Sequence, residues 1–293
     1  MNDPRFRRRR LWAGSILVVL VAGLVAVISG PGDGSRNARS SAGARRPGGV
    51  GSMGATQTGT GDGRAAAQTG AAEAVLAYTG YLTTGSPARR EIALTFDDGP
   101  GPSTLAILAI LHRARAPATF FEIGRATREY PEIERRILAA GLPIGDHTET
   151  HALLSRLDRS GQEAEISRAA LDIERQGAPY PHLMRPPYGA FDADTLAVTR
   201  SLGMLMVLWT VDTKDFSRPG VKRIIYTAVS GARPGATILF HDGGGDRSQT
   251  AAALPRIITL LRRRHYHLVT VPRLLSDDPP PRGQPAPHSL VGG

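Results

Sequence analysis

Short apolar runs alternate with longer amphipathic stretches between residues 90 and 275, and this alternation constrains the fold more than any other feature. The apolar runs have the length of buried strands and lie at 92–96, 118–123, 143–145, 183–185, 204–209, 237–240 and 267–271. The stretches between them have helical periodicity and lie at 104–115, 131–140, 162–176, 193–202, 222–229 and 251–264. Repeated β–α units of this kind predict a parallel sheet, open or closed into a barrel.

Polar side chains cluster directly after five of these predicted strands. The clusters are Asp97-Asp98, His147–His151, Arg185, Asp212 and His241. Because the carboxyl ends of parallel strands meet at one edge of the sheet, we expect the five clusters to form one site.

The sequence restricts the metal chemistry available to such a site. The chain contains no cysteine, so a metal ion needs histidine and carboxylate ligands. His147 and His151 are four residues apart, a spacing that on a helix places both imidazoles on one face. Asp97 or Asp98 is the candidate third ligand, although adjacent acids before Gly-Pro also occur in simple turns and caps. Glu149 does not occupy the base position of the HExxH metalloproteases.

Five motifs in this order resemble those of the polysaccharide deacetylases, also known as NodB-homology or carbohydrate esterase family 4 enzymes. The motifs are TFDDGP (95–100), HTETH (147–151), RPPY (185–188), WTVDTKDF (209–216) and ILFHD (238–242). The resemblance covers about residues 90–275. It implies an α/β fold with a distorted (β/α)7-type barrel, which has fewer units than a TIM barrel.

The resemblance also implies a role for each motif residue. Asp97 corresponds to the general base, and Arg185 contacts it. Asp98, His147 and His151 correspond to the metal ligands. The set suits Zn²⁺, with Co²⁺, Mn²⁺ and Ni²⁺ as alternatives. The backbone amide of Tyr188 would stabilise an oxyanion. His241 corresponds to the general acid, and Asp212 to the carboxylate that raises its pKa.

The fourth motif departs from the family pattern, which usually ends in Trp. Here Phe216 stands at that position, and we expect it to form an apolar substrate wall together with Trp209 and Leu239. We interpret the preceding Asp215 as structural. The replacement of Trp by Phe concerns substrate preference and leaves the expected reaction unchanged.

The first 29 residues have the composition of a membrane anchor. Residues 1–10 include the run RFRRRR, and residues 11–29 are 19 residues without a charge. This length spans a bilayer core of about 30 Å as a helix, and the arginines favour a cytoplasmic N-terminus. We therefore expect a single-pass protein of the cell membrane with its catalytic domain outside. A cleaved signal peptide, and thus a secreted protein, is the alternative.

The segments that flank the predicted domain, 89–275, are poor in large apolar residues. We expect a flexible linker at 30–88 and a disordered Pro-rich tail at 276–293. Residues 71–82 within the linker could form a short helix. The net charge of +10 arises mainly from residues 1–89, which carry 11 basic and 4 acidic side chains. Nucleic acid is therefore not an expected partner. We expect a monomer, although the sequence does not determine the oligomeric state.

Together these features predict a membrane-anchored, metal-dependent enzyme that hydrolyses N-acetyl groups of an extracytoplasmic glycan. The expected substrates are the N-acetylglucosamine or N-acetylmuramic acid of peptidoglycan, or a chitooligosaccharide. Two alternatives stay open: an O-deacetylase of the acetyl xylan esterase type, and a catalytically inactive module that binds the cell wall.

Overall fold

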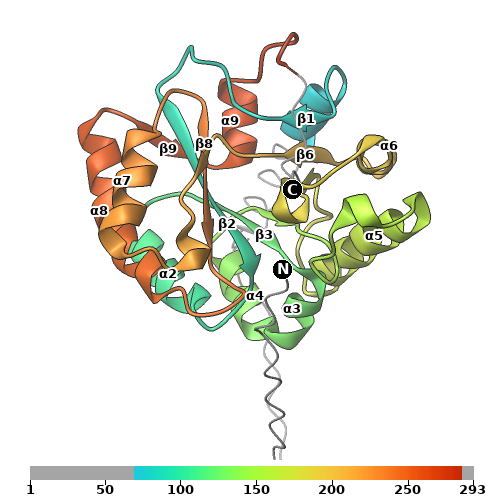
Figure 1. Cartoon of the computed structure of the whole chain (residues 1–293), viewed down its shortest axis with the longest axis horizontal. Coiled ribbons are helices and arrows are strands. Elements are labelled where there is room, and N and C mark those ends of the chain that lie inside the picture. Colours follow the sequence, from blue (N-terminus) through green and yellow to red (C-terminus); the bar gives the residue numbers. More distant parts are fainter. Residues whose placement is uncertain (1–68, 286–293) are drawn as a thin grey trace, which may run out of the picture. The chain divides into compact units, whose positions relative to one another are not determined.

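Nine strands run parallel in a single sheet within residues 69–285, the part of the chain that this computed structural model describes (Figure 1). The strands are β1 (Tyr81–Leu82), β2 (Glu91–Gly99), β3 (Thr119–Glu122), β4 (Ile144–Asp146), β5 (Leu183–Met184), β6 (Leu205–Val207), β7 (Val211–Asp212), β8 (Ala236–His241) and β9 (His267–Val269). Their order in the sheet is β1-β6-β5-β4-β3-β2-β8-β7, and β9 pairs with the first residues of β2. The seven strands expected from the apolar runs are all present.

Helices connect most of the strands and cover the outside of the sheet (Figure 1). They are α2 (Thr104–Ala114), α3 (Gly124–Glu129), α4 (Pro131–Ala139), α5 (Arg159–Arg175), α6 (Ala193–Ser201), α7 (Val221–Ser230), α8 (Ser248–Arg263) and α9 (Val271–Asp277), with a further helical segment at 69–76. The six helices expected from periodicity are present. α3 and α9 are short, with six and seven residues, and were not expected.

A single stretch of chain, which contains β6 and β7, pairs with strands near both ends of the strand order. Its first part, β6, pairs with β5 and β1, and its second part, β7, begins four residues after β6 ends and pairs with β8. The sheet therefore curls into a distorted, incompletely closed barrel. This arrangement agrees with the predicted α/β class and barrel.

The central strand β2 shows how the sequence assigns its two faces. Ile92, Leu94 and Phe96 point outward and pack in a core cluster with residues of α2, α7 and α8. The alternate residues point into the barrel, where Ala93 packs with Phe121 and Leu205. Because side chains alternate along a strand, Asp97 lies on the inward side as well. The barrel interior is therefore apolar at the amino end of β2 and polar at its carboxyl end.

The predicted boundaries of the folded domain are wrong at both ends. Residues 69–88 are part of the fold: β1 extends the sheet beside β6, and Ala72 and Val75 are buried against α9. At the other end, the Gln284 side chain donates to the carbonyl of Tyr81 at 2.6 Å and accepts from Thr83. The exposed sheet edge and the apolar face of α9 order these segments, and local composition does not reveal such long-range partners.

No helix within residues 69–285 combines the length and the apolar composition needed to cross a membrane. The membrane anchor predicted at residues 11–29 lies outside the described residues, as do the rest of the N-terminal segment up to residue 68 and the tail from residue 286.

Candidate active site

The carboxyl ends of β2 and β8 place Asp97 and His241 side by side. The two strands are neighbours, and Asp97 is the register partner of His241, just as Thr95 is the partner of Leu239 two residues earlier. Both strands point these alternate residues into the barrel. The predicted base and the predicted acid therefore face the same cavity.

A backbone irregularity allows the two consecutive aspartates to contribute to one site. In a regular strand, Asp98 would point to the opposite face from Asp97. Instead, the pairing of β2 with β3 shifts register between Asp97 and Gly99, and Asp98 adopts a left-handed φ of 73°. Bulges of this type redirect side chains at strand ends. Asp98 thus turns toward the histidines while Asp97 keeps its inward position.

Asp98, His147 and His151 form a group that could hold a metal ion. Oδ1 of Asp98 lies 3.4 Å from Nε2 of His147 and 3.2 Å from Nε2 of His151. Two ligands at about 2.0–2.1 Å from a tetrahedral ion are about 3.3 Å apart, so these distances suit a Zn²⁺-sized ion. Oδ1 of Asp98 is buried and has no hydrogen-bond partner within the described residues. Although burial alone would raise it, the two histidines lower the pKa of Asp98, which keeps the carboxylate ionised.

The HTETH segment is a loop after β4, and the helix for which its spacing was considered is absent. Thr148 and His151 both have left-handed φ values, of 67° and 63°. The ring centroids of His147 and His151 still lie 5.0 Å apart. His147 donates from Nδ1 to the carbonyl of Arg185 at 2.7 Å, which leaves Nε2 directed toward Asp98. The loop therefore brings the two imidazole rings together, as one face of a helix would have done.

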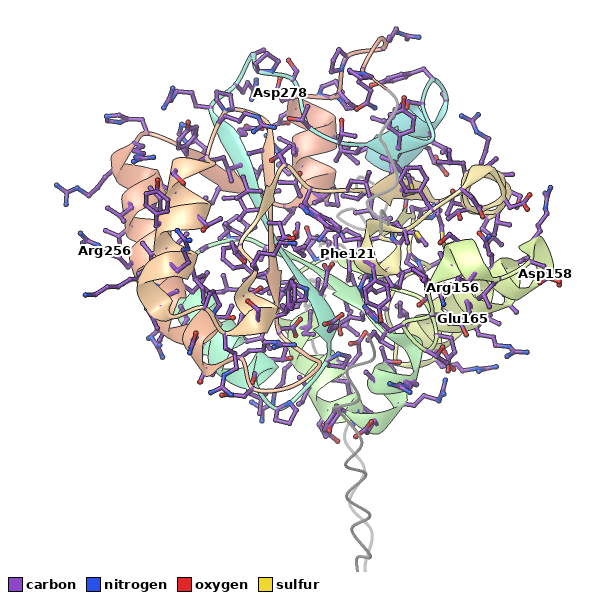
Figure 2. The ribbon with its side chains drawn as sticks, in the orientation of Figure 1. Phe121, Arg156, Asp158, Glu165, Arg256 and Asp278 are labelled. Atoms are coloured by element: carbon purple, nitrogen blue, oxygen red, sulfur yellow. The ribbon has the colours of Figure 1, made fainter. Side chains whose placement is uncertain are left out.

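Arg185 is completely buried beneath the cavity and holds Asp97 in place. Its Nη1 donates to Oδ1 of Asp97 at 2.7 Å and to Oγ1 of Thr95 at 2.8 Å. Its guanidinium lies 4.1 Å from the ring centroid of Phe121, labelled near the centre of Figure 2. Burial lowers the pKa of Arg185, and the charge of Asp97 opposes this effect. The predicted contact between Arg185 and Asp97 is thus present.

The carboxylate that pairs with His241 is Asp215, and the assignment of this role to Asp212 is wrong. Nδ1 of His241 lies 2.7 Å from Oδ1 of Asp215, while Asp212 pairs with Lys214 at 2.8 Å. Asp215 also accepts from the backbone N–H of His241 and from Oγ1 of Thr250. Both acids lie in the same motif, and their spacing alone does not show which one reaches the histidine.

The pairing changes the protonation of both partners. Burial alone would lower the pKa of His241, but the hydrogen bond and charge of Asp215 outweigh it and raise the pKa above its usual value. Burial alone would raise the pKa of Asp215, but the contacts with His241 lower it. His241 therefore favours the protonated form that a general acid requires.

A cavity of about 730 Å³ joins these groups. Of the eleven residues predicted for the site, ten line it, and the exception is Arg185. The lining residues are Asp97, Asp98, His147, His151, Tyr188, Trp209, Asp212, Lys214, Phe216, Leu239, His241, Gly244 and Arg247. Tyr188 and Phe216 are half exposed at 58% and 47%, and the Phe216 ring stands edge-on to His241 with 5.2 Å between centroids.

Three further contributors were not predicted from the motifs. Lys214, Gly244 and Arg247 line the cavity. Arg247 is buried and donates to the carbonyls of Gly243 and Gly244, so it fixes the loop that follows His241. The phenolic hydroxyl of Tyr188 lies 3.1 Å from Nδ1 of His151, a contact that adds to the role expected of its backbone amide.

Comparison with known proteins agrees with this geometry. The profile of the polysaccharide deacetylase family matches residues 84–207. A chitooligosaccharide deacetylase from Bradyrhizobium sp. is 40% identical over 63% of this chain and 90% of its own. A crystal structure of the Bc1960 peptidoglycan N-acetylglucosamine deacetylase is 30% identical, with a TM-score of 0.66 over 69% of this chain and 95% of its own. A CE4 family pseudoenzyme from Bacillus anthracis is 27% identical, with a TM-score of 0.63 over 66% and 68% of the two chains. The chain belongs to the polysaccharide deacetylase family.

Proposed function

We propose that this polysaccharide deacetylase hydrolyses N-acetyl groups of an amino-sugar polymer, with Asp97 as the general base and His241 as the general acid. The proposal rests on two ion pairs beside one cavity, one that contains Asp97 and one that contains His241. Arg185 holds the carboxylate of Asp97, and Asp215 holds the imidazole of His241. The first pair provides a proton acceptor, Asp97, and the second provides a proton donor, His241, beside the same candidate metal ligands.

Asp98, His147 and His151 would hold a divalent ion, for which Zn²⁺ fits the ligand types and distances. When bound, such an ion polarises an acyl carbonyl and acidifies a water molecule. Co²⁺, Mn²⁺ and Ni²⁺ accept the same ligands.

Asp97 is positioned to accept a proton from the attacking water. Its Oδ1 is engaged by Arg185, while its Oδ2 lies 3.8 Å from Nε2 of His147, on the side of the candidate metal ligands. A guanidinium group does not lose its proton in proteins, so Arg185 serves as a permanent positive charge that keeps the acceptor oriented. A positioned base of this kind typically contributes about 10²–10⁴-fold to the rate.

His241 is positioned to donate a proton to the departing amine nitrogen. Asp215 occupies Nδ1, so the second ring nitrogen, Nε2, is the one available for this donation. An amine leaves an acyl centre poorly unless it is protonated, so this step requires the cationic imidazole. Asp215 therefore supports the acid step through its charge and its hydrogen bond.

The named relatives act on chitooligosaccharide and on peptidoglycan N-acetylglucosamine, and we propose an acetylated amino-sugar polymer of this class for this chain. Tyr188 and Phe216 at the rim, with Trp209 and Leu239 deeper in the wall, supply apolar surface for a sugar ring and an acetyl methyl group. We further propose that residues 11–29 anchor the protein in the cell membrane, with the catalytic domain outside the cell.

The experiment is acetate release from chitooligosaccharide, purified peptidoglycan and acetylated xylan, with each divalent ion added in turn. We expect Asp97→Asn to bind the ion but lose turnover, and His147→Ala to lose both. His112→Ala changes an exposed histidine outside the cavity and serves as the matched control. Equal activity in all variants would refute the assigned roles, and release from xylan alone would indicate an O-deacetylase.

Likeness to a pseudoenzyme favours one second candidate, an inactive module that binds the cell wall. The intact set of Asp97, Asp98, His147, His151 and His241 disfavours it. Binding to wall material without acetate release under any added ion would establish that alternative.

A further inference from the structure

One side of the domain has a helical layer without acidic residues. α2, α7 and α8 pack together outside β2 and β8, on the left of Figure 1, and none of the three contains Asp or Glu. They carry Arg113, Lys222, Arg223, Arg256, Arg262 and Arg263. On the opposite side, α5 alone contains four acidic residues. The positive charge of the domain is therefore concentrated on one surface.

These basic side chains have no acidic partners within residues 69–285. None of the six forms an ion pair, whereas Arg128 pairs with Glu149 and Asp172, and Arg175 pairs with Asp172. Arg262 is engaged only by carbonyls at the end of α2, at 2.7 Å from that of Ala114 and 3.0 Å from that of Arg115. Clustered like charges repel each other, so the binding of an anion that neutralises them lowers the free energy of this surface.

Two adjoining hollows run through this surface. The first, of about 590 Å³, is lined by Arg113, Arg262 and Arg263 together with apolar residues of α2 and α8. The second, of about 410 Å³, is lined by Arg115, Arg262, His265 and His267 among others. They share Arg262, so a ligand can extend from one into the other. They lie at the carboxyl ends of α2 and α8, which is the opposite end of the barrel from the catalytic cavity.

We propose that Arg113, Arg115, Arg256, Arg262 and Arg263 form a binding surface for a linear, phosphate-bearing polyanion. All five are arginines, whose planar guanidinium groups bind phosphate through paired hydrogen bonds. The two connected hollows fit an extended polymer better than an isolated anion. Of the large exposed hydrophobic side chains of the described residues, Leu105 lies on α2 and Tyr226 on α7, but neither lines a hollow. Binding there leaves the catalytic end of the barrel free.

The test compares two triple variants of the full chain in detergent micelles, with inorganic polyphosphate as the probe. R113Q/R256Q/R263Q removes three charges from the proposed surface. R156Q/R159Q/R168Q removes three exposed charges on the opposite side, where Figure 2 labels Arg156 far from Arg256. Both variants keep the basic N-terminus, so its contribution cancels.

We expect the first variant to raise the Kd for polyphosphate about tenfold, as three modest ion contacts would, and the control to stay within about twofold of the wild type. The slope of log Kd against log salt should fall by about 2, since each phosphate contact on a flexible polyanion contributes ~0.7. Acetate release should be unchanged in both. Equal weakening in both variants would overturn the proposal in favour of net charge alone.

Two further outcomes would also overturn it. If monophosphate competes as effectively as polyphosphate at the same total phosphorus concentration, the arginines bind isolated anions and not a polymer. A loss of binding to vesicles of anionic lipid in the first variant, with polyphosphate binding intact, would indicate a lipid surface.

Discussion

Replacing Asp215 by Asn tests the assignment of the catalytic acid most directly. The carboxylate lies 2.7 Å from Nδ1 of His241 and raises the pKa of that imidazole. With charge centres about 4 Å apart, the two groups attract each other by about 4 kcal/mol at an effective dielectric constant of about 20. Asn keeps the shape and one hydrogen bond but removes this attraction, so the variant stabilises the protonated histidine less.

The expected result is a displacement of the alkaline limb of the kcat/KM profile toward lower pH. Above its own lowered pKa, the His241 imidazole no longer carries the proton for the leaving amine. General acid catalysis typically contributes 10²–10⁴-fold, so kcat/KM at pH 9 should fall by at least about 100-fold. At lower pH a larger share of the histidine is protonated in the variant as well, so the loss should become smaller as the pH falls.

The assay is acetate release from a chitooligosaccharide across pH 5–10 for the wild type and each variant. Asp212→Asn is the matched control, because Asp212 carries the same charge in the same motif but pairs with Lys214. We expect it to leave the alkaline limb in place. An alkaline limb that moves in Asp212→Asn and stays in Asp215→Asn would refute the pairing on which this reasoning depends.

Three further changes test the surroundings of the site. Arg185→Met should destabilise the fold by about 3–5 kcal/mol in urea titrations, because it leaves Asp97 buried without its partner; the double variant with Asp97→Ala should regain part of this loss. Gly244→Ala should weaken divalent-ion binding at least tenfold by calorimetry, since the new Cβ would lie 2.9 Å from Oδ2 of Asp98 and φ is +69°; Gly283→Ala, which meets no atom within 4 Å, should not. Burial and the charge of Asp242 raise the pKa of Glu134 to about 8. The folded state therefore holds a proton that the unfolded state releases near pH 4.5, and stability should fall by up to about 1.4 kcal/mol per unit from pH 5 to 8. Glu134→Gln should flatten that fall, and an unchanged slope would contradict the protonated state.

The sequence was sufficient to predict the strands and the convergence of the site because both follow from local rules. Apolar runs of strand length identified seven of the nine strands. Alternation along β2 and β8 directed Asp97 and His241 inward. Since parallel strands end at one edge, motifs far apart in the chain had to meet there.

The choice between Asp212 and Asp215 could not be made by the same rules. Asp212 ends the two-residue strand β7 and Asp215 follows it, and a strand this short has no periodicity that predicts which carboxylate faces His241. Lys214 adopts a left-handed conformation, and a short 3-10 turn then begins at Asp215 and carries its carboxylate under His241. Such a turn depends on contacts with α8, including the bond from Thr250, which are remote in sequence.

The same limit applies to the flanking segments. Residues 69–88 read as a linker because they have few large apolar side chains. Their order comes from a sheet edge at β6 and from Gln284, which lies 201 residues from Thr83 and 203 residues from Tyr81 in the sequence. Composition shows how many apolar side chains a segment contains. It does not show the sheet edge, the apolar face of α9 or the side chain of Gln284, on which the order of this segment depends.

Backbone strain gives an independent indication of where the function of this fold lies. Eight non-glycine residues in the described part of the chain have positive φ, and four of them, Asp98, His151, Tyr188 and Lys214, line the cavity of the candidate active site. A left-handed conformation costs a non-glycine residue roughly 1–2 kcal/mol, so it persists only where the surroundings enforce it. At Asp98 the alternative is worse: a regular strand would direct the carboxylate outward, to the face where Phe96 packs against Phe120 and Phe240. The bulge avoids burying that charge among aromatic rings, and it places the carboxylate between two histidines.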